Sequence, residues 1–360
     1  MQIGFLGLNL FLEVLNSCSW NCPGCFVNKS NRAEEFLAAD VERLSSLCDE
    51  YQAKGHPLQR LFVGPTDFLT ATNFTELSQS KEFKHLANRF DILTMYSTLL
   101  GDIGNFRERF SKIKSVHPNI KVIVPVMAKN VLEQSSYVER LKERLQLLKD
   151  EFGIDDIQFA FNLLPKDNQS FLKISELFLA EFGIKPEYNL SFSRSLDLTS
   201  DREEIYSKLQ FVYNQLDFSI GRDGGAEETV EDWFVRILVY REGQLFHMPL
   251  LLDPYINFDS RFVHTEDWNY EGLQKHESQL VLESYQSLDQ LPECGTCEFL
   301  GLCSHLGINR LMMRMGEKRC IAPKGHFEDA NEVSDYRVWP WSHTSKKNLE
   351  GAESTHIIGE

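Results

Sequence analysis

The chain has 360 residues, of which 42% are apolar and 25% are charged. This composition is ordinary for a globular protein, excludes disorder as the main state and leaves room for one large and one smaller domain. Acidic residues outnumber basic residues by 53 to 37, so the surface as a whole, with a net charge of -16, repels nucleic acid. The apolar start lacks the basic region and cleavage site of a secretory signal, and no later window reaches the roughly 20 apolar residues of a membrane span. We therefore expect a cytoplasmic protein that contacts neither nucleic acid nor membrane.

Short apolar runs alternate with longer segments of helical period through the first part of the chain. The expected strands are residues 10–17, 58–63, 92–97, 121–127, 157–163 and 188–193. The expected helices are residues 38–54, 75–88, 105–117, 131–152, 169–182 and 200–216. Asp40 and Ser200 have side chains typical of helix starts, whereas Gly55, Gly153 and Gly183 stand where helices should end. Six strand–helix units, rather than eight, predict an α/β fold built as an incomplete parallel (β/α)6 barrel of the TIM type.

The pattern changes after residues 221–228, which are rich in glycine and charge. Two strands are expected next, around a turn at Glu242 and Gly243. Residues 292–323 are then dense in cysteine and glycine, as is usual where metal ligation replaces a hydrophobic core. We therefore expect a barrel at residues 1–220, a small Cys-rich domain that opens with a β-hairpin at 221–330, and a C-terminal tail at 331–360.

Three of the eight cysteines follow the first expected strand closely. Cys18, Cys22 and Cys25 are separated by three and then two residues, and three thiolates on a short loop can hold three irons of a cubane cluster and leave the fourth iron open. A zinc knuckle that lacks one ligand, or a redox pair with a bystander, is the alternative interpretation. The position at the carboxyl end of a barrel strand, where such folds keep their chemistry, favours the cluster.

This segment resembles the radical S-adenosylmethionine (radical SAM) superfamily, in which a Cys-x-x-x-Cys-x-x-Cys loop follows the first strand of a six-unit partial barrel. The resemblance implies that Cys18, Cys22 and Cys25 hold a [4Fe-4S] cluster whose open iron is chelated by the amino and carboxylate groups of S-adenosylmethionine (AdoMet). One electron then cleaves the sulfonium to methionine and a 5'-deoxyadenosyl radical. The family usually has an aromatic residue near the adenine just before the third cysteine, whereas this chain has Gly24 there and Phe26 after it.

The family's Gly-Gly-Glu-Pro turn, which receives the methionyl ammonium at the end of the second strand, has a degenerate counterpart here. Gly64 permits the turn, and Thr66 or Asp67 offers an oxygen acceptor for the ammonium. The alternative is a plain strand-to-helix turn with a solvated Asp67. Polar side chains at the ends of later strands, which suit ribose hydroxyls and a carboxylate, are Ser97, Thr98, Asn162, Ser191, Ser193 and Arg194.

A second group of cysteines lies near the other end of the chain and consists of Cys294, Cys297, Cys303 and Cys320. Four thiols are a complete set for zinc or for a cubane cluster, and their spacing alone does not choose between the metals. After a radical SAM barrel, this run resembles the SPASM and twitch extensions, which implies one auxiliary [4Fe-4S] cluster. A second auxiliary cluster is not expected, because Gly307 occupies one of its ligand positions and the hairpin contains no cysteine. Cys48 and His247 are expected to be core residues.

Members of the family with SPASM extensions mostly modify ribosomally made peptides. The resemblance therefore implies a radical SAM oxidoreductase that crosslinks or oxidises such a peptide, with flavodoxin or ferredoxin as external electron donor. The short segment before the first strand makes a separate leader-peptide-binding protein a candidate partner. The alternatives are a dehydrogenase or epimerase of a sugar, cyclitol or nucleoside, an activase of a glycyl-radical enzyme, and a zinc-stabilised scaffold without catalysis. Asp67, Glu187 and His247 are candidate proton acceptors, but the sequence assigns none of them as the catalytic base.

Overall fold

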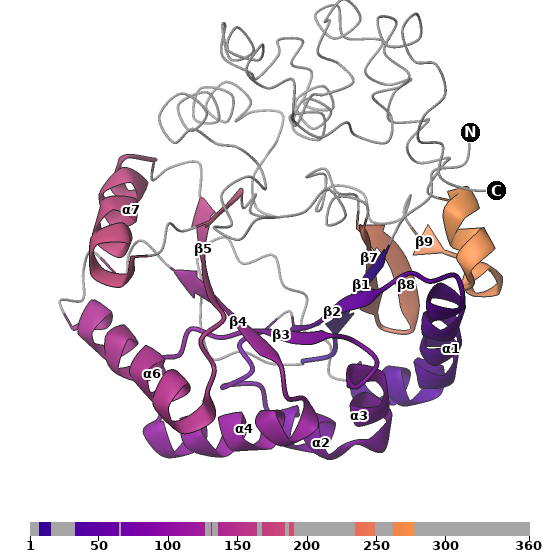
Figure 1. The fold of residues 1–360 in the computed structure, drawn as a ribbon, viewed down its shortest axis with the longest axis horizontal. Helices are drawn as coiled ribbons and strands as arrows, with labels where there is room; N and C mark the ends of the chain where they lie inside the picture. The colour runs from indigo at the N-terminus through magenta and orange to yellow at the C-terminus, as the bar shows by residue number, and fades with distance from the viewer. Residues whose placement is uncertain are drawn as a thin grey trace, which may run out of the picture.

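Six parallel strands and the helices between them form the first part of the fold, as Figure 1 shows for this computed structural model. The structure describes residues 7–15, 33–64, 66–126, 131, 136–163, 168–183, 187–190, 235–248 and 262–276. The strands are β1 (Gly7–Glu13), β2 (Leu58–Gly64), β3 (Ile92–Tyr96), β4 (Ile120–Val126), β5 (Ile157–Leu163) and β6 (Glu187–Leu190). Each pairs in parallel with the next strand in chain order. The predicted incomplete parallel barrel is therefore confirmed for these residues.

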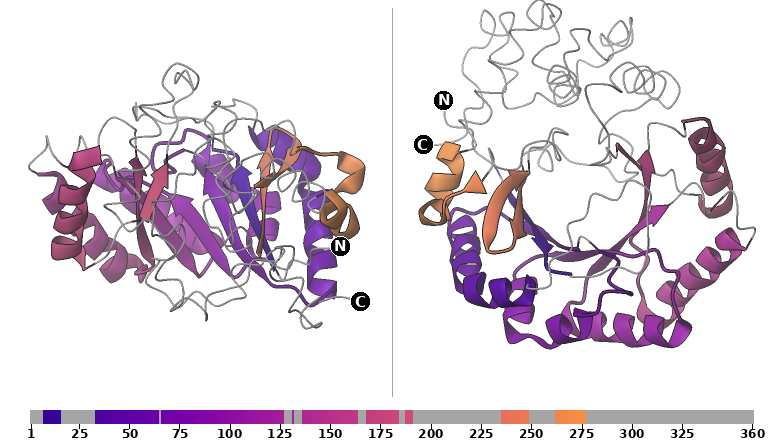
Figure 2. Two further views of the ribbon diagram at one scale, coloured as in Figure 1. Left: turned by 90° about the horizontal axis from the view of Figure 1, so that it is seen from above. Right: turned by 180° about the vertical axis from the view of Figure 1, so that it is seen from behind.

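The helices cover one side of the sheet, which curves away from them (Figures 1 and 2). They are α1 (Ala33–Ala53), α2 (Phe74–Gln79), α3 (Lys81–Ala87), α4 (Ile103–Val116), α6 (Tyr137–Phe152) and α7 (Asn168–Phe182). The hydrophobic core lies between the two layers, because alternate residues of each strand, such as Leu8, Leu10 and Leu12 of β1, are buried with apolar side chains of the helices. The concave face of the sheet carries the other set of strand residues.

Several helix boundaries follow from local chemistry. Gly55, Gly153 and Gly183 have positive φ angles of 80°, 61° and 67° just after α1, α6 and α7, so these predicted helix ends are confirmed. The expected helix at 75–88 is broken at Ser80, whose hydroxyl accepts a hydrogen bond from the Phe83 amide and starts α3. Ser200 and the helix expected at 200–216 lie outside the described residues.

The prediction that Asp40 starts a helix is wrong, because α1 already runs from Ala33. The Asp40 carboxylate is engaged instead in tertiary and side-chain contacts. It accepts hydrogen bonds from the Tyr240 hydroxyl at 2.9 Å and from Arg43 at 2.9 Å. An acidic side chain that looks like a cap in the sequence is therefore used to attach α1 to a strand far along the chain.

The predicted hairpin is present and continues the same sheet. Strand β7 (Val235–Arg241) pairs in parallel with β1, β8 (Gln244–Met248) returns antiparallel to β7, and the short β9 (Phe262–Val263) pairs with β8. Glu242 and Gly243 make the turn with φ angles of 50° and 76°, as a two-residue hairpin of the primed type requires. Residues 270–276 form a further helical segment, and the Cys-rich residues and C-terminal tail lie outside the described part of the chain. No helix in the described part is long and apolar enough to cross a membrane.

Candidate functional site

The described candidate site is the edge of the sheet where β1, β2 and β3 end. It contains Gly64, Thr66, Asp67, Ser97 and Thr98 of the predicted AdoMet-binding residues. Asn162 belongs to β5, where it pairs with Asn189 of β6, and Glu187 begins β6. The predicted residues that lie outside the described part are Cys18, Cys22, Cys25, Phe26, Ser191, Ser193, Arg194, Cys294, Cys297, Cys303 and Cys320. Among the described residues, no group of three or more potential metal ligands occurs.

The end of β1 lies directly beside the end of β2. Glu13 pairs with Gly64, and one step further the Leu15 amide donates a hydrogen bond of 2.9 Å to the Gly64 carbonyl. Leu15 is three residues before Cys18 in the sequence. The chain therefore enters the first cysteine segment at the carboxyl edge of the sheet, next to the turn that follows β2.

Gly64 lies in a closely packed part of the concave face. A Cβ atom at this position would lie 3.1 Å from Cζ of Phe11 and 3.4 Å from Cδ2 of Tyr96. The Phe11 ring also stacks on Phe62, with ring centroids 5.9 Å apart. The glycine thus lets the aromatic side chains of three neighbouring strands meet immediately below the turn.

Asp67 connects the end of β2 to the end of β3. Its Oδ1 accepts a hydrogen bond from the Leu69 amide at 2.9 Å, and its Oδ2 accepts from the Thr98 amide at 2.9 Å and the Thr98 hydroxyl at 2.7 Å. The residue is only 5% exposed, so the alternative of a solvated Asp67 is wrong. The carboxylate and the Thr98 hydroxyl satisfy each other, and both residues therefore brace the turn.

Ser97 has a similar local role. Its buried hydroxyl accepts a hydrogen bond of 3.0 Å from the amide of Leu99, which has a positive φ of 59°. A side-chain acceptor two residues earlier stabilises this left-handed backbone. Ser97 therefore shapes the turn after β3.

Thr66 differs from its neighbours because its hydroxyl has no hydrogen-bond partner among the described residues. The side chain is 2% exposed, and Oγ1 is buried. A buried hydroxyl without a partner costs about 1–3 kcal/mol relative to a paired one. Of the two acceptors predicted for the methionyl ammonium, Asp67 already accepts three hydrogen bonds, whereas the Thr66 hydroxyl accepts none from the described residues.

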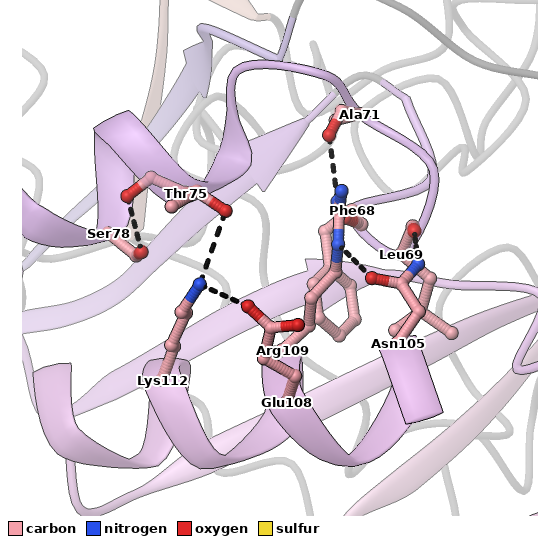
Figure 3. A network of polar contacts seen from close by, with 9 residues as sticks. All are labelled: Phe68, Leu69, Ala71, Thr75, Ser78, Asn105, Glu108, Arg109 and Lys112. Atoms are coloured by element: carbon pink, nitrogen blue, oxygen red, sulfur yellow. Dashed lines mark hydrogen bonds and ion pairs between the residues drawn. The ribbon is translucent and has the colours of Figure 1, made fainter. Parts of the chain in front are cut away.

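A polar network from α4 fixes the segment that follows β2 (Figure 3). Arg109 donates to the Ala71 carbonyl at 2.7 Å and to the Phe68 carbonyl, and its Nε donates to Asn105 Oδ1 at 2.8 Å. Asn105 in turn donates to the Leu69 carbonyl at 2.7 Å. Burial lowers the pKa of Arg109 below its usual value, and the nearby Asp67 carboxylate partly offsets this shift. Sequence reasoning missed both α4 residues, since no local pattern indicates a contact with a turn 36 to 41 positions away.

An ion pair joins the hairpin to β1 on the concave face. Arg241 donates through Nη2 to Oε1 of Glu13 at 2.5 Å, and its Nε contacts Oε2. The two side chains are 17% and 9% exposed. This pair was also not foreseen from the sequence, because its partners are 228 positions apart.

His247 lies on the other side of the sheet. It pairs with Leu238 in the β7–β8 ladder, is 3% exposed, and stacks on His276 with ring centroids 4.9 Å apart. The expectation that it is a core residue is confirmed. Cys48 is also buried, and burial raises the pKa of its thiol to about 12.

Solved structures of known proteins resemble this chain at low sequence identity. Histidine-tagged anSMEcpe with bound AdoMet is 13% identical, with a TM-score of 0.49 over 91% of this chain and 94% of that chain. Native anSMEcpe with bound AdoMet and Cp18Cys peptide is 12% identical, with a TM-score of 0.45 over 91% of this chain and 97% of that chain.

A further similar structure is Streptococcus suis SuiB bound to S-adenosylmethionine. It is 10% identical, with a TM-score of 0.38 over 76% of this chain and 65% of that chain. No protein-family model and no curated protein sequence matches the chain.

Proposed function

We propose that this chain is a radical SAM enzyme. The observation that supports the proposal most strongly is the meeting of two features at one edge of the sheet. The chain enters the Cys18, Cys22 and Cys25 segment beside the end of β2, and the turn after β2 holds the unpartnered Thr66 hydroxyl. A buried acceptor without a protein donor among the described residues fits a ligand that brings its own donor, and the ammonium of AdoMet is such a group.

In this proposal three thiolates hold a [4Fe-4S] cluster, and the bound cluster supplies one electron for reductive cleavage of AdoMet. The protein contributes binding and orientation. Thr66 accepts a hydrogen bond from the methionyl ammonium, while Asp67 and Thr98 hold the turn that presents it. Gly64 leaves room for Phe11 and Tyr96 below the turn, and we assign Asn162 of β5 to contact the ribose or the carboxylate of AdoMet. Phe26, Ser191 and Arg194 complete the proposed contacts with AdoMet, while Ser97 contributes by shaping the turn after β3.

We further propose that the substrate is a ribosomally made peptide that is crosslinked or oxidised. This part rests on Cys294, Cys297, Cys303 and Cys320, whose run is similar to SPASM and twitch extensions. Four thiolates leave no open iron, so an auxiliary [4Fe-4S] cluster there would transfer electrons or support the fold. Flavodoxin or ferredoxin is the proposed electron donor, and the reducing cytoplasm suits cysteines that are reserved for metal.

Metal analysis after anaerobic reconstitution tests both cysteine sets. We expect about eight irons per chain, and about four in a variant with Cys18, Cys22 and Cys25 changed to Ala. The same change at the four distal cysteines should also leave about four irons. Zinc bound by the distal cysteines would overturn the auxiliary cluster, and unchanged iron in the first variant would overturn the assignment of the radical SAM cluster.

A further inference from the structure

One peptide group just before the cysteine segment is hydrogen-bonded at both of its polar atoms. The carbonyl of Val14 accepts a hydrogen bond of 2.8 Å from the Asn73 side-chain amide, and the amide of Leu15, in the same peptide group, donates to the Gly64 carbonyl at 2.9 Å. Both Val14 and Asn73 are buried, with 0% and 4% exposure. The orientation of this peptide plane is therefore set by the last residue of β2 and by Asn73, which lies 59 positions after Val14.

The donor itself is held firmly. Asn73 precedes α2, and its own carbonyl accepts a hydrogen bond of 3.0 Å from the Leu77 amide in the first turn of that helix. Arg109 binds the carbonyls of Phe68 and Ala71 in the segment leading to Asn73. The Asn73 side chain does not cap α2, so its amide is used for the long-range bond to β1 instead.

Leu15 is close enough to Cys18 for its orientation to matter. Three residues span at most about 10 Å even when fully extended, so a rotation of the Val14–Leu15 peptide must be absorbed within a very short piece of chain. Hydrogen bonds and solvent exposure at a cluster's sulfurs set its reduction potential. If Cys18, Cys22 and Cys25 hold a cluster, a change in the direction from which the chain enters this segment would alter the surroundings of its sulfurs.

We propose that Asn73 is a positioning residue for the AdoMet-binding cluster: its amide fixes the Val14–Leu15 peptide and thereby the point from which the Cys18 segment starts. This inference rests on the proposed function of Cys18, Cys22 and Cys25. The turn after β2 then has two roles, because it also presents the Thr66 hydroxyl. The segment after β2 therefore positions the cluster through Asn73 and the ligand through Thr66.

The test compares Asn73→Ala with Asn119→Ala in the reconstituted full chain. The Asn119 side-chain amide also donates to a backbone carbonyl, that of Asp91, at 3.1 Å. Asn119 lies just before β4, at the amino-terminal end of the strands and therefore away from the candidate site. The measurements are iron content, thermal unfolding, the midpoint potential, and the EPR spectrum of the reduced cluster with and without AdoMet. Asn73→Ser is the second variant, because serine is compatible with a helix start but too short to replace the amide.

We expect Asn73→Ala and Asn73→Ser to bind the wild-type amount of iron, with a shifted midpoint potential and a changed AdoMet-dependent EPR spectrum. Cluster loss in air should be several-fold faster, whereas Asn119→Ala should match the wild type in iron content, midpoint potential, EPR spectrum and rate of cluster loss. If Asn73→Ala does not fold, Asn73→Ser decides the question. A wild-type potential and EPR spectrum in a folded Asn73 variant would overturn the inference, while a wild-type protein without any AdoMet-responsive EPR signal would overturn the proposed function itself.

Discussion

Replacing Thr66 by Val should stabilise the ligand-free protein and weaken AdoMet binding at the same time. Valine has nearly the same shape as threonine but lacks the hydroxyl, which is buried and unpartnered among the described residues. Removing such a group should raise the free energy of unfolding by about 1 kcal/mol. A hydrogen bond to a charged donor contributes about 1.5–3 kcal/mol, so its loss should raise the Kd for AdoMet roughly 10- to 150-fold.

The matched control is Thr94→Val. Thr94 is 0% exposed, its hydroxyl also has no partner among the described residues, and it lies within β3, where Phe62 is its neighbour on β2. Thr94→Val should raise the free energy of unfolding by a similar amount and leave the Kd for AdoMet unchanged. Urea unfolding and calorimetric titration of AdoMet under anaerobic conditions measure the two quantities. Equal AdoMet affinity in Thr66→Val and the wild type would refute the assignment of Thr66 as the ammonium acceptor.

Two sets of substitutions test the contacts around the site, and one labelling experiment tests the burial of Cys48 in α1. Asp67→Ala should lower the free energy of unfolding by about 2–4 kcal/mol, because it leaves two buried backbone amides without an acceptor; a loss below about 1 kcal/mol in urea unfolding would contradict the bracing role. Arg241→Ala should lower the free energy of unfolding by about 2–3 kcal/mol, somewhat less than the loss of a fully buried pair, because Arg241 is 17% exposed. Adding Glu13→Gln should recover part of this loss, because it removes the charge left without a partner. No recovery in thermal unfolding would argue against the ion pair as the cause. The Cys48 pKa of about 12 exceeds its ordinary value of 9.0, because burial disfavours the thiolate. The free energy of unfolding should therefore not depend on Cys48 below pH 9, and it should fall as the pH rises from 9 toward 12. Peptide mass spectrometry after iodoacetamide treatment at pH 8 should find Cys48 unmodified in the folded protein, and rapid labelling would contradict its burial.

The sequence predicts the repeating part of the fold well because its signals are local. Apolar alternation and glycine helix ends depend on a few neighbouring residues, and they located β2, β5 and the ends of α6 and α7 within one residue. The first strand is expected at 10–17 but runs over Gly7–Glu13. Its pairing with β2 ends at Glu13 and its pairing with β7 at Leu12, although the apolar residues Val14 and Leu15 follow. Element boundaries are decided by pairing partners, which the local pattern does not contain.

The candidate site was foreseen in its position but only partly in its chemistry. The ends of β2 and β3 were expected to offer polar groups, and Thr66, Asp67 and Thr98 are there. Their different roles depend on contacts between segments about 30 positions apart. Asp67 accepts hydrogen bonds from the Thr98 amide and hydroxyl, whereas the Thr66 hydroxyl has no hydrogen-bond partner among the described residues. Asn73 and Arg109 bind backbone carbonyls, which have no sequence signature at all.

The central claim is that Cys18, Cys22 and Cys25 hold the cluster at which AdoMet is cleaved. The most direct measurement is the amount of 5'-deoxyadenosine formed from AdoMet by the anaerobically reconstituted chain under dithionite, compared with the Cys22→Ala variant. We predict time-dependent 5'-deoxyadenosine formation by the wild type and none above background by the variant, whose distal cysteines remain intact. A fully iron-loaded wild-type protein that forms no 5'-deoxyadenosine, or a Cys22→Ala variant that forms it at the wild-type rate, would contradict the account.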